Sequence, residues 1–223
     1  MLPEAARAHV RARRLREGET VTLFDGAGQE YVAALVNIER RDISVRIESV
    51  APGLGFATPE LTLGLSVIAA DRMDWAIQKV CELGVARIIP ILAERSQAPG
   101  NAVNKVPHWQ AVASSAAEQS SRARVAAIAQ PMRVEDALNF GRYLPESAQI
   151  TPQVWLCERA EPSSILDVPT SSNFVFVGPE GGWAQSELAT FESVKARTLV
   201  LSRATLRSET AAVAAALLLL PVR

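Results

Sequence analysis

The sequence predicts an α/β protein in which a small β domain precedes a larger domain with a mostly parallel sheet and flanking helices. Three observations support this prediction. Closely spaced β-forming runs fill the first fifty residues, short apolar runs alternate with helical patterns after residue 60, and a stretch rich in Pro and Gly at 50–59 separates the two parts. With 223 residues, the chain is long enough to bury a substantial core.

The composition is that of a globular protein, with 48% hydrophobic residues, 21% charged residues and a net charge of −1. Cys81 and Cys157 are the only cysteines, which fits a reducing cytosol, so we expect a cytoplasmic protein. His9 and His108 are the only histidines and leave little material for a zinc site or a catalytic triad. The longest apolar run, 211–222, is too short to span a bilayer, and the amino terminus lacks the apolar core of a signal peptide.

Positive charge is concentrated near the amino terminus, although the whole chain is nearly neutral. Five arginines follow one another without an intervening acid: Arg7, Arg11, Arg13, Arg14 and Arg16. Such a cluster can supply contacts to nucleic-acid phosphates. The alternative is an arginine-rich surface helix that is simply solvated.

The first fifty residues predict a helical start followed by three strands at 20–24, 30–38 and 43–47. Asp25-Gly26 between the first two strands is a strong hairpin signal. Gly26-Ala27-Gly28 has the spacing that opens a dinucleotide-binding fingerprint, but it joins two strands instead of opening a helix, so that interpretation fails.

The second part begins with a strand at 61–69 and a helix at 71–83, for which we expect Asp71 as N-cap and Gly84 as the residue that ends the helix. The apolar stripe of this helix consists of Met73, Ile77, Val80 and Cys81. Further segments continue the alternation of strands and helices: 87–93, a longer helix at 104–121, 125–128, 134–140, 154–157 and 173–177.

Two turns near the carboxyl terminus are the predicted active site. Each follows a short apolar run, at 173–177 and 198–201, and each leads into a helical pattern. The first turn is Gly178-Pro179-Glu180-Gly181-Gly182, whose glycines allow a ligand to approach the backbone. The second brings Arg207, Glu209 and Thr210 onto the first turn of a helix. Turns at the carboxyl ends of parallel strands are where α/β proteins bind ligands.

A purely structural interpretation of these turns is also available. A Gly-Pro-x-Gly-Gly turn is common between elements, Thr205 or Ser208 can serve as a plain N-cap, and the Ala-rich run behind them can be a plain buried helix. The pairing of both turns in one domain favours the functional interpretation.

These turns resemble those of the SPOUT class of methyltransferases, specifically the ribosomal RNA small subunit methyltransferase E family. That family carries a Gly-Pro-Glu-Gly-Gly turn followed by a Leu-Gly-x-Arg-Ile-Leu-Arg-x-Glu-Thr-Ala segment. Four further motifs match upstream: Leu23-Phe24-Asp25-Gly26, Gln78-Lys79-x-x-Glu82-Leu83-Gly84-Val85, Glu94-Arg95-Ser96 and Glu118-Gln119-Ser120-x-Arg122. The resemblance spans nearly the whole chain, and the order and spacing of the motifs make it specific.

The resemblance implies a PUA-like, RNA-binding β-barrel at 1–55 and a SPOUT methyltransferase domain at 60–223, in which the C-terminal segment passes through a preceding loop to form a trefoil knot. Family members start with an extra strand before the position of Met1, so its absence implies an incomplete barrel or a start codon placed too late. SPOUT enzymes are homodimers, so we expect C₂ symmetry. The helix at 205–220 is apolar nearly all round, which fits either a subunit interface or burial within one chain.

The resemblance further implies S-adenosylmethionine as methyl donor and N3 of a uridine in 16S ribosomal RNA, within the small ribosomal subunit, as acceptor. Methyl transfer by in-line displacement needs no metal. Apolar side chains and close backbone would hold the cofactor, and the residues expected to do so are Leu156, Val177, Gly178, Pro179, Gly181, Gly182, Leu201, Ser202, Leu206, Arg207 and Thr210.

The expected catalytic residues are Arg207 and Glu209. Because neutral uridine N3 carries a proton, the enzyme must remove it or stabilise the resulting anion, and Arg207 is the candidate for that stabilisation. Glu209 is a candidate base, or alternatively a carboxylate that stabilises the helix N-terminus. The target base would be flipped out or single-stranded, and Arg11, Arg13 and Arg14 are the expected RNA-binding residues.

The sequence departs from the family pattern at three positions. Ala204 stands where members have arginine, with Arg203 one position earlier; Ser202 replaces a glycine and must avoid positive φ; and Ala184 replaces a serine cap, which costs roughly 1 kcal/mol. Two alternative functions stay open: a SPOUT methyltransferase acting on transfer RNA or on ribose 2′-hydroxyls, and an RNA-binding ribosome-assembly factor with weakened catalysis.

Overall fold

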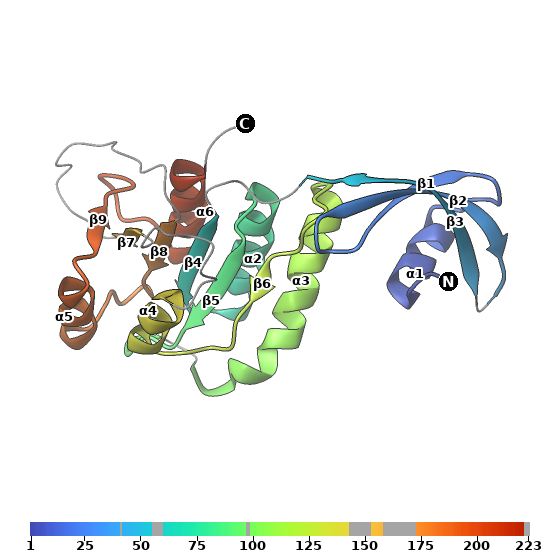
Figure 1. Cartoon of the computed structure of the whole chain (residues 1–223). Coiled ribbons are helices and arrows are strands. Elements are labelled where there is room, and N and C mark those ends of the chain that lie inside the picture. Colours follow the sequence, from blue (N-terminus) through green and yellow to red (C-terminus); the bar gives the residue numbers. More distant parts are fainter. Residues whose placement is uncertain (41, 55–59, 97–98, 143–152, 158–172, 221–223) are drawn as a thin grey trace. The chain divides into compact units, whose positions relative to one another are not determined.

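The computed structural model describes residues 1–40, 42–54, 60–96, 99–142, 153–157 and 173–220. It divides the chain into two compact units (Figure 1). The first comprises Met1–Gly55 together with Ser121–Arg124, and the second comprises Phe56–Ser120 and Val125–Arg223. No helix in the described ranges is both long and apolar enough to cross a membrane.

The first unit is a three-stranded antiparallel sheet with one helix packed on it. The elements are α1 (Glu4–Ala12), β1 (Thr20–Phe24), β2 (Gln29–Ile38) and β3 (Ile43–Pro52), in the sheet order β1-β2-β3. Leu2, Val10, Leu35 and Ile43 form its small buried core. The predicted helical start and three strands are confirmed. However, β3 continues to Pro52 because its second half pairs with the start of β2, so the predicted linker begins too early.

The predicted hairpin between β1 and β2 is confirmed, and Asp25 organises it. One carboxylate oxygen, Oδ1, accepts hydrogen bonds from the backbone N–H groups of Ala27 at 2.8 Å, Gly28 at 3.1 Å and Gln29 at 3.1 Å. The bonds from Ala27 and Gln29 are the main cause of a lowered pKa for this carboxyl. Gly26 and Gly28 have φ of 77° and 117°, which favours glycine at both positions.

A short segment from the second half of the chain completes the first unit. The N–H of Gly28 donates to the carbonyl of Ala123 at 3.1 Å, and the N–H of Ala123 donates to the carbonyl of Leu54 at 2.9 Å. A Cβ on Gly53 would lie 2.3 Å from the Cβ of Ala123, so the close approach requires glycine. Nothing in the sequence pattern predicts this return of the chain.

The second unit contains a six-stranded sheet in the order β6-β5-β4-β8-β7-β9, and every pairing is parallel. Its strands are β4 (Leu61–Ser66), β5 (Arg87–Ile91), β6 (Ala127–Ile128), β7 (Gln153–Cys157), β8 (Asn173–Val177) and β9 (Arg197–Leu199). The predicted α/β class with a parallel sheet is therefore confirmed.

Helices cover both faces of this sheet (Figure 1). One face carries α2 (Ala70–Leu83), α3 (Val106–Gln119) and α6 (Ser208–Leu219), and the other carries α4 (Val134–Arg142) and α5 (Gln185–Ser193). Two 3₁₀ turns, η1 (Pro99–Asn101) and η2 (Val103–Lys105), precede α3. Helix α3 is therefore shorter than the predicted helix at 104–121, because the first residues of that range adopt the tighter 3₁₀ form.

Side chains alternate between the two faces along the central strands. Leu63 and Leu65 of β4 pack with α2 and α6, whereas Phe174 and Phe176 of β8 point to the opposite core. A Cβ on Gly64 would lie 2.6 Å from the Phe176 ring, so glycine there lets the ring lie against β4. These aromatic rings anchor the strand that leads into the first predicted turn.

Helix α2 begins and ends differently from the way its sequence suggests. The predicted N-cap, Asp71, is wrong: Ala69 is the N-cap and makes no side-chain capping bond, while Asp71 lies in the first turn, where its carboxylate favours the helix dipole. Gly84, with φ of 102°, ends the helix as predicted. The predicted apolar stripe is also confirmed, since all four of its residues are buried.

The C-terminal path is the unusual part of the topology. Strand β9 pairs with β7 at the edge of the sheet, and α6 then returns to pack against α2, β4 and β8. Whether this return passes through the connection between β7 and β8 depends on residues 158–172, which lie outside the described residues. The trefoil knot therefore stays a prediction.

Candidate active site

The two predicted turns lie side by side and enclose a cavity of about 360 Å³. The cavity lies at the carboxyl ends of β7 and β8; the first turn follows β8, and the second follows β9, which pairs with β7. Its lining residues are Cys157, Val177, Gly178, Pro179, Glu180, Gly182, Trp183, Leu201, Ser202, Ala204, Thr205, Leu206, Ser208 and Ala211. A volume of this size suits a small organic ligand.

The first turn presents its backbone to the cavity. The N–H of Gly182 donates to the carbonyl of Pro179 at 2.9 Å, which closes a β-turn, and Gly182 has φ of 69°. A Cβ on Gly178 would lie 3.0 Å from the indole nitrogen of Trp183, so glycine lets the indole pack against the backbone. Trp183 is buried and packs edge-on against Phe191 of α5. The turn is thus held by aromatic packing beneath it.

Hydrogen bonds from distant parts of the chain also hold the first turn. The hydroxyl of Ser208, the first residue of α6, donates to the carbonyl of Gly178 at 2.7 Å. Nη1 of Arg95, which follows β5, donates to the carbonyl of Gly181 at 3.1 Å. The Glu94-Arg95-Ser96 motif noted in the sequence therefore has a structural role beside the cavity.

An ion pair makes a further connection to the same turn. The guanidinium of Arg72, in the first turn of α2, contacts the carboxylate of Glu180. Both side chains are half-buried, with exposed fractions of 37% and 27%. The first turn, residues 178–182, is thus contacted by three residues that are distant in the sequence: Arg72, Arg95 and Ser208.

The second turn supplies apolar walls and hydroxyl groups. Leu201 and Leu206 are half-buried against the same core as α6. The N–H of Ala204 donates to the hydroxyl of Ser202 at 3.0 Å, which stabilises the turn locally. As expected, Ser202 avoids positive φ: Arg14, Ser121 and Lys195 are the non-glycine residues with positive φ in the part of the chain described.

The structure brings seven of the eleven expected cofactor residues to the cavity: Val177, Gly178, Pro179, Gly182, Leu201, Ser202 and Leu206. Four lie outside its lining. Leu156 is buried in the core on the opposite face of the sheet, and Gly181 lies against Arg95. Thr210 is exposed on α6, and Arg207, also exposed, lies in the chain between the lining residues Leu206 and Ser208 but does not itself line the cavity.

Seven lining residues were not among the expected cofactor residues: Cys157, Glu180, Trp183, Ala204, Thr205, Ser208 and Ala211. The period of two along β7 could have identified Cys157, since it and Trp155 pack on the α6 face while Leu156 faces away. Burial raises the pKa of the Cys157 thiol to about 12, so the thiol is neutral at physiological pH. For the other six residues, the sequence pattern does not distinguish a residue that lines the cavity from one that only forms a turn.

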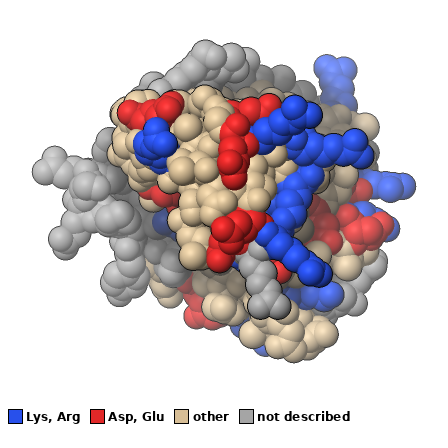
Figure 2. All heavy atoms as spheres, turned by 90° about the vertical axis from the view of Figure 1, so that its right-hand side faces the viewer, with Lys and Arg blue, Asp and Glu red and all other residues tan. Residues whose placement is uncertain are grey.

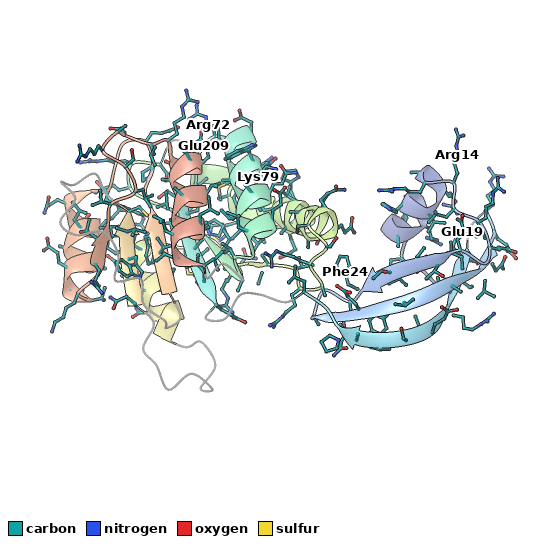
Figure 3. The ribbon with its side chains drawn as sticks, turned by 90° about the horizontal axis from the view of Figure 1, so that it is seen from above. Arg14, Glu19, Phe24, Arg72, Lys79 and Glu209 are labelled. Atoms are coloured by element: carbon teal, nitrogen blue, oxygen red, sulfur yellow. The ribbon has the colours of Figure 1, made fainter. Side chains whose placement is uncertain are left out.

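The two expected catalytic residues have opposite environments. The Arg207 side chain is 73% exposed, whereas that of Glu209 is 11% exposed, and Nη1 of Arg207 lies 4.0 Å from Oε1 of Glu209. Oε2 of Glu209 is buried and has no hydrogen-bond partner in the described ranges. Figure 3 shows Glu209 and Arg72 at the neighbouring ends where α6 and α2 begin. Glu209 does not line the cavity.

The cavity combines apolar walls, three side-chain hydroxyls and accessible backbone from a glycine-rich turn. This combination suits a ligand with a flat, weakly polar ring and a polar chain. Within the ranges that the structure describes, no group of three His, Cys, Asp or Glu residues could hold a metal ion.

The three expected RNA-binding arginines of the first unit differ in whether their side chains are held by hydrogen bonds. Nη2 of Arg11 donates to the backbone carbonyls of Arg40 at 2.7 Å and Glu39 at 3.3 Å. Arg13 and Arg14 are exposed, and within the described residues their side chains make no hydrogen bond or ion pair. Figure 2 shows the end of the chain that carries the first unit, where basic side chains form a band bordered by acidic ones.

Comparison with known proteins finds a matching family model for each of the two units. Residues 57–220 match the family model of the RNA methyltransferase domain, and residues 2–48 match that of the RNA methyltransferase PUA domain. The chain is 30% identical over 207 residues to ribosomal RNA small subunit methyltransferase E of Rickettsia conorii, which covers 91% of this chain and 80% of the relative. It is also 30% identical over 217 residues to the protein of that name from Aquifex aeolicus, covering 96% and 90%.

Solved structures give a matching result. The crystal structure of ribosomal RNA small subunit methyltransferase E from Neisseria gonorrhoeae, bound to S-adenosyl methionine, superposes with a TM-score of 0.84. The two sequences are 30% identical, and the alignment covers 97% of this chain and 88% of the other.

The hydrogen bond between the two turns yields a stability prediction. Ser208→Ala removes the donor to the Gly178 carbonyl, so we expect the free energy of unfolding, measured by urea denaturation, to fall by about 1–2 kcal/mol. Ser114→Ala is the control, because that hydroxyl donates to the Gln110 carbonyl one turn back in its own helix and connects no distant parts of the chain that the structure describes. Its effect should stay within about 0.5 kcal/mol, and equal losses in both variants would contradict the assigned role of Ser208.

Proposed function

The chain belongs to the ribosomal RNA small subunit methyltransferase E family, and from this premise we propose that it transfers a methyl group from S-adenosylmethionine to N3 of a uridine in 16S ribosomal RNA. The observation that carries the proposal is the cavity enclosed by the two turns of residues 178–182 and 201–208. A relative with the same fold and 30% identity was crystallised with the proposed methyl donor.

The residues around the cavity fit such a donor. Val177, Leu201 and Leu206 provide apolar walls for an adenine ring, and the backbone of Gly178 and Gly182 is open to a close approach. A side chain at either glycine would alter the turn, since a Cβ at position 178 meets Trp183 and position 182 has positive φ. These features are the reason for assigning the donor to this cavity.

When bound, S-adenosylmethionine supplies an electrophilic methyl group on a sulfonium sulfur. The protein must orient the acceptor and favour its anionic form, because neutral uridine N3 carries a proton and has no free in-plane lone pair. We assign the stabilisation of that anion to Arg207, whose side chain is exposed and which lies in the chain between the lining residues Leu206 and Ser208. The N3 proton then passes to solvent.

For Glu209 the structure favours a positioning role over that of a general base. Its carboxylate is nine-tenths buried, lies outside the cavity lining and faces Arg207 at 4.0 Å. A base has to reach the proton that it abstracts, and the Glu209 side chain is only 11% exposed, whereas that of Arg207 is 73% exposed and accessible to an RNA substrate. We therefore propose that Glu209 orients the Arg207 guanidinium and favours the N-terminal dipole of α6.

The departures from the family pattern affect the wall of the cavity. Ala204 lines it, where family members carry arginine, while Arg203 is exposed beside it. Ala184 begins α5 without a side-chain cap, but the carboxylate of Glu187 accepts the N–H of Ala184 at 2.8 Å and preserves that part of the capping interaction.

The activity can be tested directly with the purified chain. Small ribosomal subunits and naked 16S RNA from a strain lacking this gene would be incubated with S-adenosylmethionine, and the RNA mapped by mass spectrometry. A single new methyl group on uridine N3 is the expected result. A methyl group on a ribose or on transfer RNA would reassign the substrate, and RNA binding without cofactor binding would favour an assembly factor.

Replacement of Arg207 tests the catalytic assignment. We expect Arg207→Ala to retain cofactor affinity within a few-fold but to lose at least ~10²-fold in turnover, the scale of one missing transition-state donor. Glu209→Gln, which preserves the size of the side chain, should lose less and keep the acidic limb of the pH–rate profile. Wild-type turnover in Arg207→Ala would exclude the role, and loss of the acidic limb in Glu209→Gln would return the base role to Glu209.

The first unit yields a binding prediction. Charge removal by Arg13→Gln with Arg14→Gln should weaken RNA binding and reduce the slope of log affinity against log salt by about one for each lost phosphate contact. Arg11→Gln should instead lower stability, because its guanidinium holds the β2–β3 turn. An unchanged salt slope in the double variant would mean that these arginines do not contact RNA.

We also propose a C₂ homodimer formed through α6 and α2. One face of α6 is buried within the chain, whereas Leu217 and Leu218 on its other face and Trp75 on the adjoining α2 are exposed. Exposed apolar side chains of this size on packed helices favour a subunit interface. Light scattering at micromolar concentration should give twice the 24.0 kDa chain mass, and Leu217→Glu should shift the protein towards monomer. A monomeric wild type would contradict the proposal.

A further inference from the structure

Glu180 is the one charged residue among the described residues that line the cavity. It occupies the corner of the β-turn closed by the hydrogen bond from Gly182 to Pro179. The remaining lining residues are apolar, hydroxyl-bearing or glycine, apart from the neutral thiol of Cys157. A ligand with a positive charge would therefore find one anionic partner there.

The carboxylate of Glu180 is paired with the guanidinium of Arg72, which reaches it from the first turn of α2. The pair is not required to shape the turn, because three other contacts already fix its backbone. These are the internal bond between Gly182 and Pro179 and the bonds that Gly178 and Gly181 accept from Ser208 and Arg95. The ion pair thus leaves a positive and a negative group together at the edge of the cavity.

We propose that the Arg72–Glu180 pair binds the zwitterionic amino-acid end of the methyl donor, an inference that rests on the proposed function. Glu180 would accept hydrogen bonds from the α-ammonium group, and Arg72 would donate to the α-carboxylate. A guanidinium donates to a carboxylate through two parallel N–H groups, and an ammonium donates to a carboxylate as a compact charge. The two charges of the protein therefore match the two charges of the ligand.

The partial exposure of the pair supports this role. At 37% and 27% exposure, neither side chain is fully desolvated, so separating the charges enough to admit a ligand costs little. The other arginine that holds the turn, Arg95, is engaged with the Gly181 carbonyl, and Arg207 faces Glu209. Arg72 is thus the cation placed to act together with Glu180.

Calorimetric titration with two ligands tests the inference without measuring turnover. S-adenosylmethionine has the amino-acid end, and 5′-methylthioadenosine shares the adenosine but lacks it. We expect Glu180→Gln and Arg72→Met each to weaken S-adenosylmethionine binding about tenfold or more, the scale of one lost charge-assisted hydrogen bond. Binding of 5′-methylthioadenosine should stay within twofold of the wild type in both variants.

Lys79→Met is the matched control, because it removes another ion pair from the same helix, that of Lys79 with Glu82. It should leave both affinities unchanged. Unchanged S-adenosylmethionine affinity in Glu180→Gln and Arg72→Met, or an equal loss of 5′-methylthioadenosine affinity, would overturn this inference alone. If the folded wild-type chain bound neither compound, the proposed function would fail together with it.

Discussion

The hydrogen bond from the Ser208 hydroxyl to the Gly178 carbonyl is the contact on which the candidate site depends. Thirty residues separate its ends in the sequence, yet it joins the start of α6 directly to the end of β8. Each turn alone would be an ordinary strand-to-helix connection. Joined in this way, they become two walls of one cavity whose geometry is set before any ligand arrives.

The parallel sheet explains why such a contact is possible at all. Because every pairing in the sheet is parallel, β8 and β9, which flank β7, end at the same edge, so the two turns that follow them lie close together. The aromatic core beneath, with Phe176 against Gly64 and Trp183 against Phe191, fixes the end of β8 from the opposite face. Packing on one side of the sheet therefore positions backbone atoms that face the other.

Periodicity and turn chemistry were enough to predict the strands of both units, the parallel class and the two turns. The Gly178–Gly182 and 201–211 segments were recognisable because glycine and charged residues follow apolar runs there. The partners of the turns were not predictable. Arg72 and Arg95 lie 108 and 86 residues before the groups that they contact, and no local pattern encodes a contact at that distance. The burial of Glu209 likewise depends on how α6 packs against α2.

The incorporation of Ser121–Arg124 into the first unit has a consequence for how this architecture can be divided. The amino-terminal unit is assembled from two separate stretches of chain, so it cannot be removed as one continuous segment. Cutting at the Pro- and Gly-rich stretch after β3 would strand Ala123 without its partners Gly28 and Leu54. Recombination that exchanges the amino-terminal unit must therefore carry the loop after α3 along with it, so the two units cannot be exchanged independently.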